Sequence, residues 1–172
     1  ALSVREALDV TRLVAEALRH MQIEGYLHRD VKPANILVGD GVVKLCDLGL
    51  AAAIEERAAI STAVGTATYV SPEQARGEVD LKAGTDIYAL GLVAYFMISG
   101  REAFDGLDEQ AVMNDRFTEG VKTPDVASLP APEGVRRLVA RMLHPDRTRR
   151  YTSYGELLSG IESAQCSVSS AQ

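Results

Sequence analysis

The stretch His28-Arg29-Asp30-Val31-Lys32-Pro33-Ala34-Asn35 decides how the rest of the chain is interpreted. It places an acid, two bases and an amide within eight residues. The segments on either side of it are apolar and patterned like parts of a packed core. A concentration of polar side chains between two core-forming segments indicates a loop with a chemical role.

A helix is predicted over residues 4–24, directly before this loop. Ser3 and Glu6 have the spacing of a capping box, in which a serine oxygen and a glutamate satisfy free backbone N–H groups. Apolar residues then recur at helical spacing on one face. They are Val4, Leu8, Val14, Leu18 and Met21. Gly25 predicts the end of the helix, because glycine adopts a left-handed conformation at low cost.

A β-hairpin is predicted directly after the loop. Two β-branched runs, residues 36–38 and 42–45, flank Gly39-Asp40-Gly41, which has the composition of a hairpin turn. The hairpin carries the chain back to Asp47, so we expect Asp47 to lie beside Asn35. Residues 50–68 are small, polar and weakly periodic, which predicts a long loop of the kind that is usually functional.

The remainder of the chain is predicted to be helical. Residues 71–77 begin with a proline and end with a glycine, as short helices often do. Residues 86–99 are apolar nearly all round, which in a soluble protein indicates a central buried helix. Thr85 or Asp86 is expected to cap its start. Further helices are expected at 108–117, 132–143 and 153–164.

The fold class is therefore mainly α with one small β-hairpin. The chain of 172 residues is long enough for one domain, or most of one. Residues 165–172 are rich in Ser, Ala and Gln, and we expect them to form a disordered linker.

Composition excludes several classes of partner and location. The net charge of −6 argues against broad binding to nucleic acid or to an anionic membrane. The sequence contains no run of about 18 apolar residues, so no membrane-spanning helix is predicted. Cys46 and Cys166 match no metal-ligand spacing and suggest free thiols in a reducing compartment. We therefore expect a cytoplasmic domain.

Three motifs, in order, resemble the signature set of protein kinases: the stretch from His28 to Asn35, then Asp47-Leu48-Gly49, then Ser71-Pro72-Glu73. The sequence of residues 65–77 is similar to that of bacterial eukaryotic-like serine/threonine kinases. The resemblance covers residues 1–164 and implies the C-terminal lobe of the kinase fold. Leu48 stands where many kinases have Phe, and it is still an apolar side chain.

The resemblance implies that an upstream lobe is missing from this chain. No Gly-rich loop and no lysine-bearing strand precede the first predicted helix. In this family those parts form the N-terminal lobe, which covers ATP and holds its phosphates. We expect that lobe to precede Ala1 in the full-length protein, and the chain alone to be inactive.

The resemblance also implies site residues. Asp30 would accept the proton of the substrate hydroxyl or orient that hydroxyl, and Lys32 would offset charge on the transferred phosphate. Asn35 and Asp47 would hold Mg²⁺, and together with Lys32 and Leu37 they would bind ATP. Each residue alone has a plainer interpretation as a turn residue, a cap or a solvated charge. The joint occurrence of the motifs favours roles in catalysis and ATP binding for these residues.

Two further features of the resemblance point to transfer onto serine or threonine. Lys32 lies two residues after Asp30, as in serine/threonine kinases, and Thr66 matches the threonine that faces these two residues in that family. Arg29 is expected to pair with a phosphorylated residue of the long loop, because a guanidinium matches a phosphate. Thr62 is the first candidate for autophosphorylation and Ser61 the second.

Structural roles are expected for four residues. In the family, the ring of His28 packs in the core, and its backbone is held by the carboxylate at a helix start, here Asp86. Glu73 is expected to pair with a distant arginine. The candidates are Arg147, Arg149 and Arg150, and alignment with the family's usual Arg-aromatic ending favours Arg150.

The function implied is that of an ATP-dependent serine/threonine protein kinase acting on a protein substrate. A pseudokinase or scaffold that only binds partners is the main alternative. A phosphotransferase for small molecules is a third. It is disfavoured by the long loop and by Ser71-Pro72-Glu73, which in this family present a protein substrate. Anchoring of the full-length protein in a membrane stays open, with the Ser-rich tail as a juxtamembrane linker.

Overall fold

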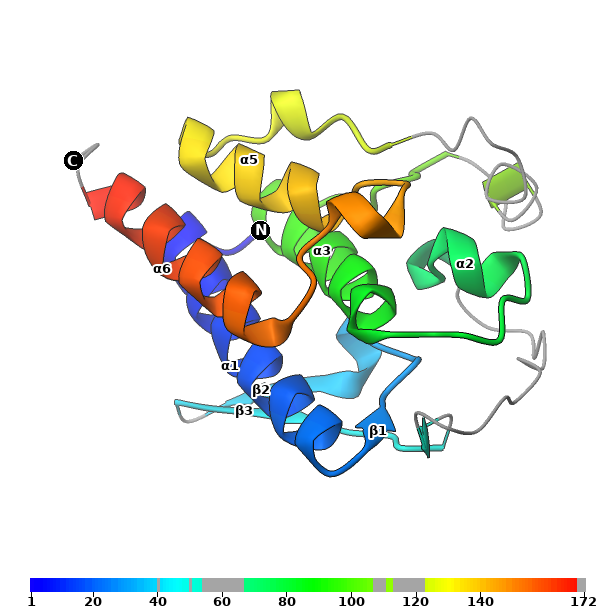
Figure 1. The fold of residues 1–172 in the computed structure, drawn as a ribbon. Coiled ribbons are helices and arrows are strands. Elements are labelled where there is room, and N and C mark those ends of the chain that lie inside the picture. Colours follow the sequence, from blue (N-terminus) through cyan, green and yellow to red (C-terminus); the bar gives the residue numbers. More distant parts are fainter. Residues whose placement is uncertain (40, 50, 54–66, 107–110, 113–122, 170–172) are drawn as a thin grey trace.

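The computed structural model is mainly helical, and the elements below are those of the residues that it describes (Figure 1). These residues are 1–39, 41–49, 51–53, 67–106, 111–112 and 123–169. The helices are α1 (Val4–Ile23), α2 (Pro72–Ala75), α3 (Ala83–Ser99), α5 (Glu133–Met142) and α6 (Tyr154–Ser169). The strands are β1 (Tyr26–Leu27), β2 (Ile36–Gly39), β3 (Val42–Leu45) and β4 (Ala52–Ala53).

Helix α1 begins and ends where the sequence predicts. Its N-cap, Ser3, accepts a hydrogen bond from the backbone of Glu6, and the side chain of Glu6 returns to the backbone of Ser3. These hydrogen bonds with Ser3 lower the pKa of Glu6. Gly25 follows the helix at a φ of 85°. The predicted helix and its capping box are confirmed.

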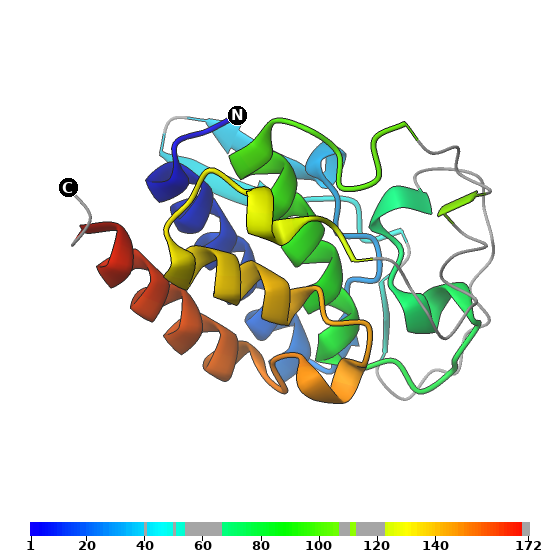
Figure 2. The ribbon, with the colours of Figure 1, turned by 90° about the horizontal axis from the view of Figure 1, so that it is seen from above.

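Helix α3 forms the centre of the fold. It packs against α1 and α5, and α6 packs against both of those helices (Figures 1 and 2). Gly91 lets α5 approach closely, because a Cβ at this position would lie 2.8 Å from the Cβ of Met142. The core therefore consists mainly of side chains from α1, α3, α5 and α6.

The start of α3 differs from the prediction. The helix begins at Ala83, three residues before the expected start, and its N-cap is Lys82, which makes no side-chain cap hydrogen bond. The prediction that Thr85 or Asp86 caps the helix is wrong. Both residues lie in the first turn, and their side chains bind other segments: Thr85 contacts Glu73, and Asp86 contacts the loop after β1.

Two small antiparallel sheets lie in the lower part of the view, beside the C-terminal half of α1 (Figure 1). The predicted hairpin is confirmed: β2 pairs with β3 in a register that matches Ile36 with Leu45 and Gly39 with Val42. The sequence analysis missed the second sheet, in which β1 pairs with β4. Its strands are two residues long, too short for any pattern to predict.

The C-terminal helix extends past its expected end. Helix α6 continues to Ser169, so the prediction of a disordered linker is wrong for residues 165–169. Composition alone suggested a linker, yet Val168 packs against the core and Gln165 donates a hydrogen bond to Asp9 of α1 at 2.8 Å. Residues 170–172 lie outside the described part.

The predicted helix at 132–143 corresponds to α5. Most of the predicted helix at 108–117 lies outside the described residues. Among the helices that the structure describes, none combines the length and the apolar character needed to cross a membrane.

Candidate active site

Asp86 of α3 holds the loop after β1 through hydrogen bonds to the loop backbone. The N–H groups of His28 and Arg29 donate to the two carboxylate oxygens of Asp86 at 3.0 and 2.8 Å. Asp86 is fully buried; burial raises the pKa of its carboxyl group, and the two N–H donors oppose that rise. Two backbone donors thus compensate a buried acid on α3, and the acid fixes the start of the loop.

His28 links this loop to the strand that precedes Asp47. Its Nδ1 lies 3.3 Å from the N–H of Asp30 and its Nε2 lies 3.1 Å from the carbonyl oxygen of Cys46. A backbone N–H can only donate, so Nδ1 accepts, and Nε2 carries the hydrogen that it donates to Cys46. The ring is completely buried. This geometry fits a structural role for His28 and leaves neither nitrogen available as a catalytic base.

The side chains of Asp30, Lys32 and Asn35 meet within the loop. Lys32 Nζ lies 2.7 Å from Asp30 Oδ2, and Asn35 Nδ2 donates to the same oxygen at 3.0 Å. Asn35 also donates to the backbone carbonyl of Asp30 at 2.9 Å. Two donors therefore orient one carboxylate oxygen of Asp30. The side chains of Asp30 and Lys32 are each 19% exposed, so solvent or a substrate can reach them.

Asp47 returns beside Asn35 through the hairpin. The pairing of Ile36 with Leu45 is extended by a hydrogen bond from the N–H of Cys46 to the carbonyl of Asn35 at 2.8 Å. Asp47 comes next in the chain, is exposed and has a φ of 61°. Left-handed backbone is unfavourable for a residue with a Cβ, and such strain is often found at functional sites.

Asn35 and Asp47 supply oxygen atoms of the type that Mg²⁺ prefers. Because Asn35 uses its amide nitrogen on Asp30, its amide oxygen is the atom left to bind a cation. No group of three or more His, Cys, Asp or Glu side chains that could hold a metal occurs in the described residues. Mg²⁺ in proteins usually takes several of its oxygen ligands from phosphate groups and water.

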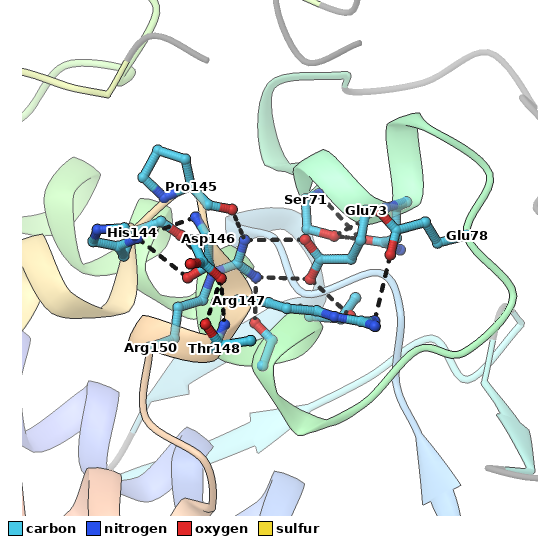
Figure 3. A network of polar contacts seen from close by, with 12 residues as sticks. Ser71, Glu73, Glu78, His144, Pro145, Asp146, Arg147, Thr148 and Arg150 are labelled. Atoms are coloured by element: carbon cyan, nitrogen blue, oxygen red, sulfur yellow. Dashed lines mark hydrogen bonds and ion pairs between the residues drawn. The ribbon is translucent and has the colours of Figure 1, made fainter. Parts of the chain in front are cut away.

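A buried ion pair joins α2 to the turn before α6 (Figure 3). Arg150 donates to both carboxylate oxygens of Glu73, at 2.7 and 3.0 Å, and the two side chains are at most 1% exposed. Burial alone would raise the pKa of Glu73, but the hydrogen bonds and charge of Arg150 outweigh burial and lower it. The structure thus brings together Glu73 and the favoured one of the three candidate arginines.

Arg150 also holds the backbone around it. Its Nε and remaining N–H groups donate to three carbonyl oxygens, those of His144, Gly84 and Pro145, at 2.6, 2.9 and 3.1 Å. All five guanidinium donors are therefore satisfied, as a buried arginine requires. Arg147 instead lies at the surface and pairs with Glu78 at 3.4 Å (Figure 3).

Two residues near the loop were missed by the sequence analysis. The hydroxyl of Tyr154 donates to Asp86 at 3.3 Å, and the amide of Gln74 donates to the carbonyl of Arg29 at 2.9 Å. Tyr154 gives no signal in the sequence, because 68 residues separate it from its partner. Gln74 does give a signal in the sequence, because Ser71 and Gln74 have the spacing of a capping box at the start of a helix.

Three predicted site residues, Ser61, Thr62 and Thr66, lie outside the described residues. Leu37 lies on β2 with its side chain 56% exposed, on the outer face of the hairpin.

The mainly helical fold with one small hairpin is consistent with the C-terminal lobe of the kinase fold. A family model described as protein kinase domain matches residues 1–161. The chain belongs to the protein kinase family.

Bacterial proteins are among the curated relatives that it resembles. A protein of Bifidobacterium longum named probable serine/threonine-protein kinase PknB is 40% identical over 168 residues. The serine/threonine-protein kinase PknA of Mycobacterium tuberculosis is 36% identical over 165 residues. These alignments cover 94% and 93% of this chain but only 24% and 37% of the relatives. The chain thus spans about a quarter to about a third of their length.

Proposed function

We propose that this chain forms the catalytic lobe of an ATP-dependent protein kinase that phosphorylates serine or threonine. The observation that carries the proposal is the carboxylate of Asp30, oriented by Lys32 and Asn35 and still accessible from solvent. In the reaction, the hydroxyl oxygen of the substrate forms a bond to the γ-phosphorus of ATP. The bond between that phosphorus and the bridging oxygen breaks, and ADP leaves.

Asp30 binds the substrate hydroxyl and accepts its proton as the new bond forms. Lys32 lies against Asp30 and carries a positive charge that compensates the charge on the transferred phosphoryl group. Asn35 keeps the carboxylate in one orientation by donating to one of its oxygens and to the backbone carbonyl of Asp30. Thr66 is proposed to face Asp30 and Lys32 on the side of the protein substrate.

Asn35 and Asp47 are proposed to hold Mg²⁺, with Lys32 and Leu37 as further residues of the ATP site. Held there, Mg²⁺ would neutralise part of the negative charge of the phosphate groups. The support from this chain is the pairing of β2 with β3, which brings Asp47 back to Asn35.

An N-terminal lobe is proposed to cover the outer face of the hairpin. Leu37 and Val42 share this face of the hairpin and are 56% and 50% exposed. Leu48, just after the hairpin, is 59% exposed. Apolar groups of this size are normally covered by another part of the protein or by a partner. We propose that residues preceding Ala1 in the full-length protein provide that lobe, and that the domain is cytoplasmic.

Transfer of radiolabelled γ-phosphate from ATP to a serine-containing and a threonine-containing protein tests the proposal in the full-length protein. Asp30→Asn should reduce the rate at least about a hundredfold, since it removes the proton acceptor. Asp105→Asn, a change of the same charge at an exposed position, should leave the rate unaltered. Equal rates for Asp30→Asn and the unmodified protein would refute the mechanism. A full-length protein that binds its partners and transfers no phosphate would instead be a scaffold.

Arg29 is proposed to bind a phosphate on Thr62 or, second, on Ser61. The proposal predicts that active full-length protein carries phosphate on one of these residues. Mass spectrometry of the peptide that spans residues 58–76 would detect it, and the same peptide from Asp30→Asn should be unmodified. Active protein with no phosphate on either residue would contradict the assignment.

A further inference from the structure

The peptide group that joins Arg29 to Asp30 is held at both of its polar atoms. The carbonyl oxygen of Arg29 accepts from Gln74 Nε2 at 2.9 Å, and the N–H of Asp30 lies 3.3 Å from His28 Nδ1. This peptide plane directly precedes the Cα of Asp30, so its orientation sets the direction of the Asp30 side chain. Gln74 is thus one of two side chains that fix the plane.

Arg29 needs such support because its backbone is left-handed. Its φ is 67°, a conformation that residues with a Cβ adopt rarely and that the surroundings must stabilise. Asp86 of α3 binds the N–H of Arg29 at 2.8 Å, and Gln74 of α2 binds its carbonyl. Two helices therefore hold one residue from opposite ends of its backbone.

The orientation of the Gln74 amide follows from its partners. The backbone N–H and the hydroxyl of Ser71 both donate to Gln74 Oε1, at 3.1 and 3.0 Å. A backbone N–H cannot accept, so the atom that faces Ser71 must be the oxygen. The nitrogen consequently faces the carbonyl of Arg29. Gln74 is 6% exposed, and water therefore competes little for either contact.

We propose that Gln74 is a positioning residue for Asp30: by donating to the carbonyl of Arg29, it fixes the peptide plane that aims the catalytic carboxylate. The helix that carries Gln74 also carries Glu73, which is bound by Arg150. A shift of α2 would therefore move the hydrogen bond from Gln74 to the carbonyl of Arg29, and with it the peptide plane before Asp30. This inference rests on the proposed function, in which Asp30 accepts the substrate proton.

The substitution Gln74→Glu separates the two contacts of this side chain. One glutamate oxygen can still accept from Ser71, which preserves the capping box. The other oxygen replaces the amide nitrogen and faces the carbonyl of Arg29, where two acceptors repel. Gln74→Met removes the donor without introducing a charge, and it serves as the second variant if the glutamate prevents folding. Gln22→Glu, in the last turn of α1, introduces the same charge on another helix.

In full-length protein at neutral pH, kcat should fall about tenfold to a hundredfold in both Gln74 variants, because the carboxylate of Asp30 is misaligned. The KM for ATP should change less than about twofold, since the nucleotide contacts remain. Gln22→Glu should behave like the unmodified protein.

The pH profile distinguishes lost donation from general damage. A protonated glutamic acid can donate its O–H to the carbonyl of Arg29. The ratio of kcat for Gln74→Glu to kcat for unmodified protein should therefore rise as the pH falls from 8 to 6. The ratio for Gln74→Met should stay flat. A flat ratio for Gln74→Glu, or kcat within about twofold of the unmodified protein in both variants, would overturn the inference.

Hydrogen exchange provides a readout that does not depend on catalysis. Peptides covering residues 27–31 should exchange their amide hydrogens faster in both Gln74 variants, and peptides from α5 should be unaffected. If the unmodified protein transferred no phosphate, the proposed function would fail while this measurement still decided the role of Gln74. Unchanged exchange in residues 27–31 would then overturn the inference on its own.

Discussion

Replacing Glu73 by glutamine is expected to destabilise the fold strongly. Glu73 and Arg150 are both almost completely buried, and Arg150 directs three of its N–H contacts at carbonyl oxygens that stay in place. Glu73→Gln removes the negative charge, so the guanidinium remains buried without a counter-charge. It also places an amide N–H against guanidinium N–H groups, which are donors too.

The magnitude follows from the burial. Removing one partner of a buried pair costs about 3 to 5 kcal/mol, because the stranded charge cannot reach water. The same change in an exposed pair costs less than about 1 kcal/mol. Glu133 and Arg137 on α5 form such a pair, with side chains 70% and 72% exposed. Glu133→Gln is therefore the matched control.

Urea unfolding followed by far-UV circular dichroism measures the difference. With an m value of about 1 to 3 kcal/mol per molar urea, Glu73→Gln should lower the midpoint by at least about 1 M. Combining Glu73→Gln with Arg150→Met should cost less than the sum of the single changes, because the double variant strands no charge. A loss for Glu73→Gln no larger than that for Glu133→Gln would refute the reasoning.

The advantage of Glu73 over glutamine also depends on pH, with a sign fixed by its pKa. The fold lowers the pKa of Glu73 from its ordinary value of 4.5, despite the opposing effect of burial. The stabilisation is therefore complete above pH 4.5 and is lost as the pH falls through the lower pKa of the folded state. The difference in unfolding free energy between Glu73→Gln and the unmodified protein should shrink in acid, measured by urea unfolding at each pH.

Two further predictions concern packing and a buried hydroxyl. Gly91→Ala should cost about 1 to 3 kcal/mol in urea unfolding, because its Cβ would lie 2.8 Å from a side-chain carbon of α5; Gly84→Ala, in the same helix and with its nearest contact at 4.0 Å, should cost nothing and can gain up to about 1 kcal/mol. Tyr154→Phe should cost about 1 to 2 kcal/mol by removing a donor from buried Asp86, whereas Tyr26→Phe, at an exposed tyrosine, should cost almost nothing.

Local signals in the sequence predicted the elements that local interactions stabilise. The capping box at Ser3 and the turn around Gly41 involve residues close in the chain, so α1 and the hairpin follow from the sequence. The predicted start of α3 was wrong because aspartate is a common helix cap, whereas the side chain of Asp86 instead accepts hydrogen bonds from the loop that begins at His28. The end of α6 was misplaced because a tail rich in serine looks like a linker until Gln165 meets Asp9.

The candidate site shows the same division. Asp30, Lys32 and Asn35 lie within one loop, so their spacing alone was enough to bring them together. Glu73 needed an arginine 77 residues away, and three were available. The family resemblance favoured Arg150 among them. In the tertiary structure Arg150 turns inward, where every donor finds an acceptor, while Arg147 stays at the surface.

The loop combines a rigid backbone with accessible side chains. Asp86, His28 and Gln74 are buried, and each binds main-chain atoms of the loop. Asp30 and Lys32 are left partly exposed, with no role in the core. A buried polar group is costly unless it is bonded, so these buried residues can hold only one loop conformation without loss. These three buried side chains thus fix the backbone of the loop, as strand pairing fixes the backbone of the hairpin. The directions of Asp30 and Lys32 are therefore set before a substrate binds.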